Sequence, residues 1–575
     1  MPYVAPLAEY KFLFDHVVGF SDICATARFE DVSSDITDAL LSEAGKVCEE
    51  VLAPLQRVGD IQHAVLKDGV VVMPDGFKEA YRALADGGWM GISAHPDGGG
   101  MGLPLTLTSA VNEMMASACL SLQLNPLMTQ GQIEALEAHA DDKIKQTYLP
   151  KLISGEWSGT MNLTEPQAGS DVGALTTRAV PRGDGTFEIT GQKIYISYGD
   201  HDMAENICHL VLARLPNAPA GTKGISLFMV PKYLPDDNGD AGQANALHVV
   251  SLEHKMGLHA SPTAVMQYDG ATGWLVGAEH AGMAAMFTMM NNARVGVAIQ
   301  GTGVAEGALQ HALSYARDRK QGRTNVPNDV VATGAIVDHA DVRRMLAAMK
   351  ADLFAARAIA LSCAAAIDMG TATRDTFWHA RAAFLTPIAK AFGTDVGMAV
   401  AAEGIQVHGG MGFIEETGAA QYSRDARVTA IYEGTNGIQA MDLVARKLAD
   451  GGDAAFALIE EVQTQAESCR GTHESLAGPL WEASETLRET TEWMVSQSDS
   501  NHRFAGAVPY LRGFARVLGG HYHLKAALAA GPDSGRARLA RFYIKRLLPE
   551  HAGLLAHARE GADDLYALST EDLLA

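Results

Sequence analysis

The chain has 575 residues, which is too long for one ordinary hydrophobic core and, at roughly 150 residues per domain, predicts three or four domains. Its apolar fraction of 47% and charged fraction of 20% are those of a folded globular protein and argue against disorder. The formal net charge of -23 disfavours attraction to nucleic acid or anionic membrane surfaces, so neither is expected as the principal partner.

The N-terminal part of the chain is predicted to be helical. Residues 1–34 are expected to form an extension, which carries acidic residues and lacks the basic region and unbroken apolar run of a secretory signal. Over 35–160, apolar residues recur at three- and four-residue spacing between Pro and Gly breaks, which predicts a helical domain. No uncharged apolar stretch approaches the roughly 20 residues of a membrane-spanning helix, so membrane insertion is not expected.

The pattern changes over 161–285, where short runs such as TFEITGQKIYIS and GISLFMVPK are rich in β-branched and aromatic residues. These runs predict a small β domain. Long helical periodicity returns over 286–450, and a Gly-Gly-Asp break leads into a further helical module over 451–575. The sequence therefore predicts a mainly α fold with a small β domain between helical domains.

Residues 161–174, MNLTEPQAGSDVGA, are the first candidate for a functional loop. Thr164 and Ser170 supply hydroxyl groups next to backbone amides, and such donors can face a heteroaromatic ring or a carbonyl group. Turns made by Ser, Thr and Asp explain the same composition, and from this segment alone that structural interpretation is favoured.

Residues 426–439, ARVTAIYEGTNGIQ, place Glu433 after two bulky apolar residues and before Gly434, where backbone can approach a ligand closely. Loss of hydration in such surroundings raises the pKa of a carboxyl group and makes it a better base near neutrality, as deprotonation of a carbon acid requires. A carboxylate at a helix start, next to Thr435 and Asn436, explains this segment alone equally well.

Two further segments are candidate ligand contacts. EGIQVHGGMGF, residues 403–413, has three glycines within four positions, which would permit backbone contact with a bulky ligand, although a helix C-terminal turn is the commoner explanation. Arg319 ends a long predicted helix and could bind phosphate bidentately, although a solvated cationic helix end is the usual meaning.

Other patterns predict no separate chemistry. GTGVAEG, residues 301–307, is one residue too long for a dinucleotide fingerprint and lies within a helical run, so it is interpreted as close helix packing. The six cysteines are scattered without a C-x-x-C pair, and no histidines stand at metal-ligand spacing. The sequence therefore predicts no metal site, and reduced thiols in a cytoplasmic protein.

The motifs together resemble the acyl-CoA dehydrogenase family over almost the whole chain. The corresponding segments, in order, are LTEPQAGSD, KIYIS, NNARVGVA, YARDRK, IQVHGGMGF, SRDAR and IYEGTNGIQ. The resemblance implies a helical domain, a β-barrel-like domain and a four-helix domain, here followed by the C-terminal helical module. This module and the N-terminal extension resemble the large bacterial members, which include 3-methylthiopropanoyl-CoA dehydrogenases.

The resemblance also implies the chemistry. Glu433 is expected to remove the α-proton of an acyl-CoA while the β-hydride passes to FAD, which leaves a trans-2-enoyl-CoA. The backbone N–H of Glu433 is expected to stabilise the enolate oxygen. The residues implied to contact FAD are Met161, Leu163, Thr164, Ser170, Tyr195, Ile196, Ser197, Arg319, Gln406, Gly409, Gly410, Thr435 and Asn436, and those implied to contact the substrate are Ser170, Asn291, Arg294 and Gly434. Tyr195 departs from the Trp that the family has there.

Each FAD in the family is completed by two chains, with Arg319, Gln406, Gly409 and Gly410 reaching the cofactor of a neighbour, so a homo-oligomer, either dimer or tetramer, is implied. Electron-transfer flavoprotein is the expected electron acceptor. Three alternatives stay open: a dehydrogenase of medium or long straight-chain acyl-CoA, an acyl-CoA oxidase, and a DNA-binding relative. The last is motivated by residues 501–550, which contain nine basic residues against two acidic ones, although such charge runs usually mean solvated or internally paired helices.

Overall fold

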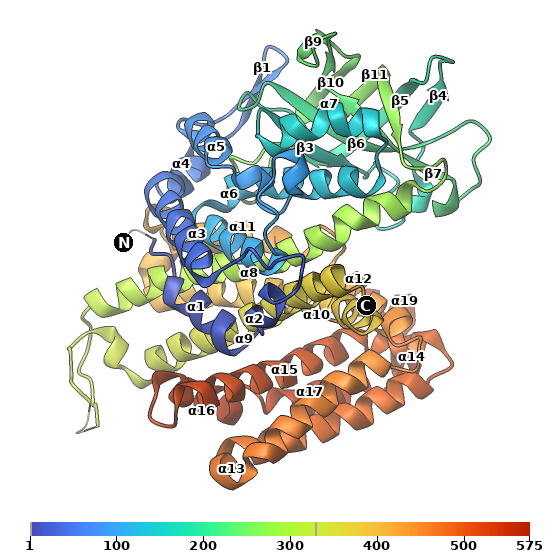
Figure 1. Ribbon diagram of the computed structural model, residues 1–575. Coiled ribbons are helices and arrows are strands. Elements are labelled where there is room, and N and C mark those ends of the chain that lie inside the picture. The colour runs from blue at the N-terminus through green and yellow to red at the C-terminus, as the bar shows by residue number, and fades with distance from the viewer. Residues whose placement is uncertain (1–2, 328–329) are drawn as a thin grey trace.

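Helices form most of the chain in the computed structural model, which describes residues 3–327 and 330–575 (Figure 1). A β domain lies at one end of the molecule, the long central helices cross the middle, and the C-terminal helices lie at the opposite end (Figure 1). The N-terminal helices pack along one side of the central ones. Mainly α structure with one small β domain is thus confirmed.

The N-terminal helices are α1 Leu7–His16, α2 Phe20–Cys24, α3 Ser34–Val47, α4 Leu55–Ile61, α5 Phe77–Asp86, α6 Leu105–His139 and α7 Asp142–Ile153. A hairpin of β1 Val65–Lys67 and β2 Val70–Val72 interrupts them, which the prediction of a purely helical segment missed. The signal was present: Asp68 and Gly69 both have positive φ, 51° and 80°, and an Asp-Gly pair between β-branched residues favours this tight turn.

The β domain is a seven-stranded sheet that closes on itself, because β7 pairs with both β6 and β11. β5 lies between β11 and β4, while β3 runs parallel to β6 at one edge. The strands are β3 Trp157–Asn162, β4 Arg178–Pro181, β5 Phe187–Ser197, β6 Asn206–Arg214, β7 Ile225–Pro231, β10 Leu247–Leu252 and β11 Thr263–Val276, with a separate hairpin of β8 Tyr233–Pro235 and β9 Ala241–Ala244.

Strand β6 shows how this domain joins the helices. Leu210 and Leu212 pack in a core shared with α6 and α7, whereas Val211 and Ala213 pack inside the barrel. Because successive side chains of a strand point to opposite faces, β6 is buried on both faces and its central residues are apolar except for His209. This burial on both faces explains the nearly unbroken apolar run ICHLVLA.

The central helices are α8 Gly282–Asp318, α9 Ala340–Thr373, α10 Thr376–His408, α11 Ala419–Arg427 and α12 Asn436–Asp442. GTGVAEG does mark close packing, since a Cβ added at Gly301 would lie 2.4 Å from the Gly393 carbonyl oxygen of α10. Among the described helices, α9 alone is long and apolar enough to cross a membrane, and 89% of its most apolar stretch is buried inside the protein.

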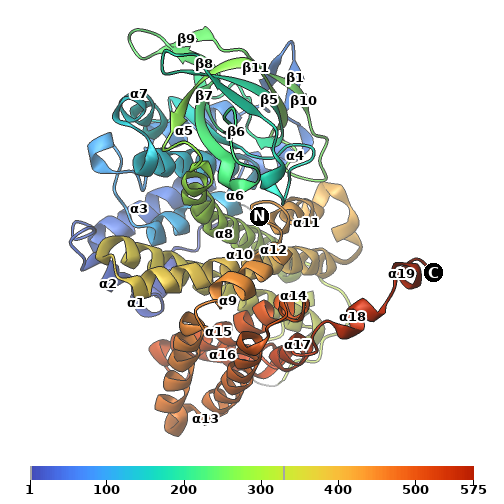
Figure 2. The ribbon, with the colours of Figure 1, turned by 90° about the vertical axis from the view of Figure 1, so that its right-hand side faces the viewer.

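The C-terminal module comprises α13 Asp453–Ser496, α14 Ser500–Ala505, α15 Ala507–Ala530, α16 Gly535–Arg546, α17 Glu550–Ala558, α18 Asp563–Ala567 and α19 Thr570–Leu574. Helix α13 is kinked at His473. The last two helices form an arm that projects from the body on the same side as α11 (Figure 2).

Candidate functional site

Glu433 lies in a short loop between α11 and α12. Its φ of +54° and that of Gly434, +85°, are both left-handed, so two consecutive residues turn the chain sharply. The Gln439 side chain donates a hydrogen bond to the Glu433 carbonyl, at 3.0 Å, and a Cβ at Gly434 would lie 2.8 Å from the same amide nitrogen. Glycine is therefore needed at 434 both for its conformation and for space.

The structure separates Glu433 from the role of helix cap. The cap of α12 is Thr435, whose hydroxyl oxygen accepts a hydrogen bond from the backbone of Ile438 at 3.2 Å. Among the described residues, no group donates a hydrogen bond to the Glu433 carboxylate, and the backbone N–H of Glu433 donates to none. Both groups are thus available to a ligand.

Two cations determine the electrostatics around Glu433. Burial raises its pKa to about 7, against the opposing effects of Arg294 on α8 and Lys390 on α10. Arg294 is buried, 3.9 Å from the Asp442 carboxylate, and its Nε has no hydrogen-bond partner. A carboxyl group with this pKa can accept a proton near neutral pH.

The predicted flavin-facing segments come together beside β3. The backbone N–H of Ile194 donates to the Thr164 carbonyl at 2.9 Å, and the Thr160 hydroxyl donates to the Ser197 carbonyl at 2.8 Å. These bonds place residues 161–164 next to residues 195–197. Tyr195 has a φ of +60° at an irregularity in the β5–β11 pairing, and its side chain is 61% exposed.

A buried ion pair fixes the loop that follows β3. Lys193 donates to the Leu163 carbonyl and to the Glu165 carboxylate, at 2.9 and 2.8 Å. Glu165 also accepts bonds from the backbone and hydroxyl of both Thr176 and Thr177. Burial would raise the pKa of Glu165, but Lys193 and these donors hold it at about 2. Ser170 lies farther along this loop and is exposed.

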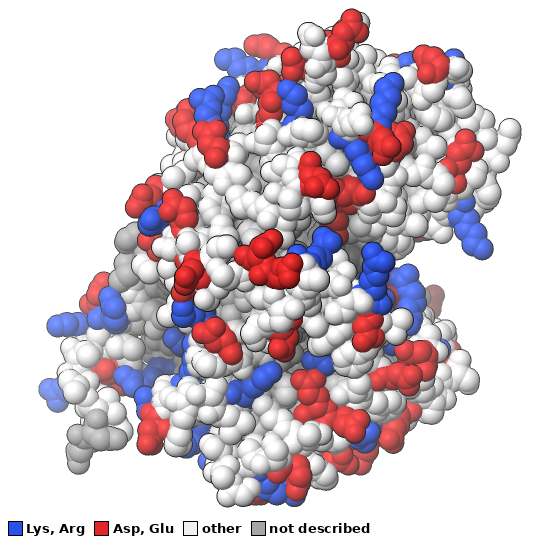
Figure 3. Space-filling model, in the orientation of Figure 1, with Lys and Arg blue, Asp and Glu red and all other residues white. Residues whose placement is uncertain are grey.

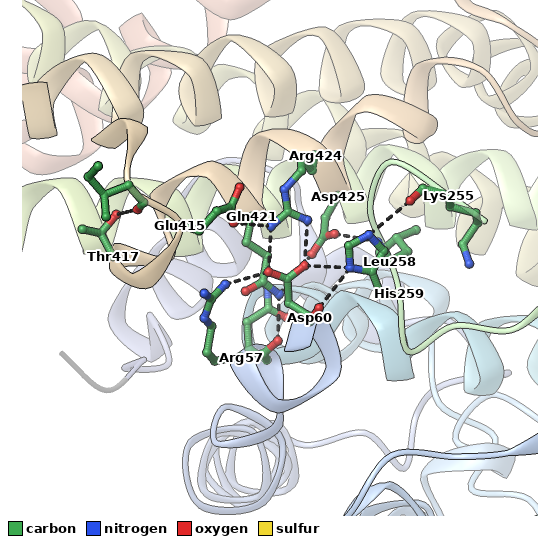
Figure 4. A network of polar contacts seen from close by, with 12 residues as sticks. Arg57, Asp60, Lys255, Leu258, His259, Glu415, Thr417, Gln421, Arg424 and Asp425 are labelled. Atoms are coloured by element: carbon green, nitrogen blue, oxygen red, sulfur yellow. Dashed lines mark hydrogen bonds and ion pairs between the residues drawn. The ribbon is translucent and has the colours of Figure 1, made fainter. Parts of the chain in front are cut away.

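The SRDAR motif has a structural role. Arg424 binds the Asp60 carboxylate through two nitrogens, at 2.6 and 2.7 Å, and Asp425 accepts the backbone N–H of Leu258 at 2.7 Å (Figure 4). Arg57 and His259 also bind Asp60. The network joins α4, the loop before β11 and α11, so it anchors the chain just before the Glu433 loop.

A third group of predicted residues lies at the far end of the central helices. Tyr315, near the end of α8, stacks on His408 at the end of α10, with ring centroids 4.4 Å apart. Arg319, Gln406, Gly409 and Gly410 are all exposed there. Because an α-helix rises about 1.5 Å per residue, Arg294 and Arg319 are separated by roughly 37 Å along the axis of α8. One chain therefore does not bring Arg319 to Glu433.

The basic stretch over residues 501–550 is largely used inside the chain. Arg512, Arg516 and Arg536 form ion pairs with Asp395, Asp352 and Glu9 respectively. Arg503, Lys525 and Arg538 donate to backbone carbonyls. On the face drawn in Figure 3, acidic and basic side chains are interspersed over these helices. This is the internally paired arrangement that weighs against a DNA-binding surface.

The sequence analysis missed Lys390. Its ammonium group donates to the Gly434 carbonyl at 2.8 Å and to the Asn436 side-chain oxygen at 2.9 Å. The available signal was a single lysine inside the apolar helical run LTPIAKAF. Of the predicted substrate contacts, Gly434 and Arg294 lie at the Glu433 loop, whereas the side chain of Asn291 lies outside the described residues.

Family models match nearly the whole chain. Residues 34–156 match "Acyl-CoA dehydrogenase, N-terminal domain", residues 160–271 the middle domain and residues 280–448 the C-terminal domain of that family. Residues 458–569 match "Acetyl-CoA dehydrogenase C-terminal like".

Individual relatives agree with these matches. The chain is 45% identical to the 3-methylmercaptopropionyl-CoA dehydrogenase of Ruegeria pomeroyi, with 94% of each chain covered, and 31% identical to the broad-specificity linear acyl-CoA dehydrogenase of Mycobacterium tuberculosis, with 98% covered. Among solved structures, Caenorhabditis elegans ACDH-11 in complex with C11-CoA superposes with a TM-score of 0.77 at 20% identity, covering 94% of this chain and 91% of that one. Butyryl-CoA dehydrogenase from Megasphaera elsdenii superposes with a TM-score of 0.59 at 26% identity, covering 72% of this chain and 98% of that one.

Proposed function

Since the chain belongs to the acyl-CoA dehydrogenase family, we propose that Glu433 is the base that removes the α-proton of an acyl-CoA thioester, with a trans-2-enoyl-CoA as product. The observation that carries the proposal is the setting of Glu433: its carboxylate binds no protein donor in the described chain, and burial raises its pKa to about 7. A thioester α-proton is weakly acidic, so the base needs this raised pKa. It also needs help from a group that stabilises the negative charge developing on the thioester oxygen.

That help would come from the backbone N–H of Glu433, which is free in the described chain. We place the thioester carbonyl oxygen against this N–H, so that the hydrogen bond strengthens as negative charge moves onto the oxygen. Arg294 lies close enough to stabilise the ionised carboxylate before proton transfer.

The residues present fit FAD. A Cβ at Gly409 or Gly410 would meet nothing within 4 Å, so their backbone is open to a bulky ligand, and Tyr195 presents an exposed aromatic face. FAD, when bound, supplies the acceptor for the hydride that leaves the β-carbon. The residues that would hold it within one chain are Met161, Leu163, Thr164, Ser170, Tyr195, Ile196, Ser197, Thr435 and Asn436.

We also propose a homo-oligomer. Arg319, at the far end of α8 from Arg294, together with Gln406, Gly409 and Gly410, would serve the FAD of a neighbouring chain. The surface next to Gly410 supports this, because Met411, Phe413 and Ile414 are 46%, 87% and 45% exposed. Large exposed apolar side chains that gather at one place are typical of protein interfaces.

Phe413→Lys is expected to weaken self-association by about tenfold to a hundredfold, because burying a Phe side chain contributes about 1.5–3 kcal/mol. Light scattering across a concentration series would measure the change, and FAD retention should fall with it. Phe377→Lys, at the opposite end of α10 and 48% exposed, is the matched control. Equal masses for Phe413→Lys and the parent would place the interface elsewhere.

For the acyl group we favour 3-(methylthio)propanoyl, the group named for the Ruegeria pomeroyi relative. A cavity lies between α6 and α8, and Ile299 in its wall precedes Gln300, which accepts a hydrogen bond from the Tyr432 hydroxyl next to Glu433. Its wall carries seven polar side chains, which are Ser93, Thr108, Ser109, Asn112, Gln130, Glu134 and Asn292. Polar groups are costly to cover with alkyl chain, so this wall favours a short acyl group over a long one.

Anaerobic titration with 3-(methylthio)propanoyl-CoA, butyryl-CoA and palmitoyl-CoA tests the proposal. We expect the first two to bleach the oxidised flavin absorbance at lower concentrations than the third. Absence of bleaching by every acyl-CoA would refute the proposed function, and preference for palmitoyl-CoA would favour the long-chain alternative. We propose electron-transfer flavoprotein as acceptor; hydrogen peroxide formed at the rate of turnover in air would instead indicate an oxidase.

A further inference from the structure

Lys390 is an unusual residue for its position. It lies in the middle of α10, is fully buried, and has apolar neighbours in sequence on both sides. Burying an ammonium group is costly unless it is hydrogen-bonded or paired. Both bonds that it makes, to Gly434 and Asn436, lie within three residues of Glu433.

We propose that Lys390 is a positioning residue for the base: it holds the loop that carries Glu433 and keeps a positive charge beside the carboxylate. The inference rests on Glu433 being the base, as proposed above.

The first function follows from the backbone. Two consecutive left-handed residues, one of them not glycine, persist only where surrounding contacts determine the loop. Two side chains from different helices provide those contacts: Gln439 of α12 binds the carbonyl of Glu433 and Lys390 of α10 binds the carbonyl of Gly434. With both carbonyls held, the peptide plane cannot rotate, and the direction of the Glu433 side chain is determined.

Asn436 also attaches the Glu433 loop to α10. Its side-chain oxygen accepts from Lys390, while its amide nitrogen donates to the Thr394 hydroxyl at 3.0 Å and to the Asp395 carboxylate at 2.8 Å. The loop is therefore attached to α10 at two adjacent turns. Loss of Lys390 would remove its bonds to Gly434 and Asn436 and leave those of Asn436 to Thr394 and Asp395.

The second function is electrostatic. Lys390 and Arg294 both lower the pKa of Glu433 against the effect of burial, and Glu433 and Asp395 in turn oppose the fall that burial causes in the pKa of Lys390, to about 8. The other charged groups facing this cluster are paired, Asp442 of α12 with Arg446 and Asp395 with Arg512 of α15. Lys390 and Arg294 are thus the cations that determine how readily Glu433 ionises.

The test is the pH profile of flavin reduction by butyryl-CoA under single-turnover conditions. Lys390→Gln keeps a hydrogen-bond donor but removes the charge, so the pKa of Glu433 should rise by about one unit. We expect reduction about tenfold slower than in the parent at pH 6, with the two rates converging by pH 9. Lys390→Arg, which keeps the charge, should keep the parent's pH midpoint.

Lys525→Met is the matched control, because Lys525 also donates to a backbone carbonyl, that of Val17, but lies in the C-terminal module. It should leave the midpoint unchanged. An unchanged midpoint in Lys390→Gln, or a loss of rate that is equal at every pH, would overturn the proposal. Failure of butyryl-CoA and 3-(methylthio)propanoyl-CoA to bleach the parent would instead refute the proposed function, so the two failures are distinct.

Discussion

Replacing Glu433 by Gln is expected to slow flavin reduction by about 10²–10⁴-fold, the contribution of a well-placed general base. Gln has almost the same shape as Glu but cannot accept the α-proton. The substitution leaves the bonds of Gln439 and Lys390 to the loop in place, because they involve backbone carbonyls. FAD content and acyl-CoA binding should therefore be retained, which absorbance and calorimetric titration would check.

The pH dependence of kcat/KM provides a second test of Glu433 as the base. Glu433 acts as a base only when ionised, and its pKa is raised to about 7, so kcat/KM of the parent should rise with pH through a midpoint near 7. Glu433→Gln should lose this step. Glu467→Gln, an exposed carboxylate of α13, controls for the loss of one charge. Normal reduction by Glu433→Gln would assign the base to another residue.

Arg357→Met is expected to lower the free energy of unfolding by about 3–5 kcal/mol, the cost of leaving buried charge uncompensated. Arg357 of α9 binds Glu113 of α6 and Glu306 of α8, each at 2.6 Å, and its guanidinium lies 5.4 Å from the ring centroid of Tyr10 in α1. All four side chains are buried. Met fills similar space but leaves two carboxylates without their cation.

Denaturant unfolding at several pH values would measure this effect. Burial already raises the pKa of Glu113 in the folded state, and loss of Arg357 would raise it further. The deficit should therefore be largest at neutral and alkaline pH and shrink as pH falls and the carboxyl group is protonated. Arg344→Met removes an exposed pair with Asp341 and should cost about 0–1 kcal/mol. Equal losses for the two variants would contradict a structural role for the buried cluster.

Several features could be predicted from the sequence because their signals are local. Helical and strand periodicity are repeated over many residues, so the order of helical and β segments follows from pattern alone. The Asp-Gly hairpin was equally local, but its three-residue strands are too short to show a period. Lys390 could not be assigned, because its partners, Gly434 and Asn436, are more than forty positions away in the chain.

The sequence by itself determined the family resemblance and the candidacy of Glu433, since both depend on residue identity and order. It left Glu433 undecided between base and helix cap, because both uses place a carboxylate next to a turn. Only the tertiary structure excluded the role of helix cap, because Thr435 caps α12, and it showed that Arg294 and Lys390, from two other helices, act electrostatically on the Glu433 carboxylate. The raised pKa of Glu433 depends on burial and on charges brought together by folding, and no local pattern encodes either.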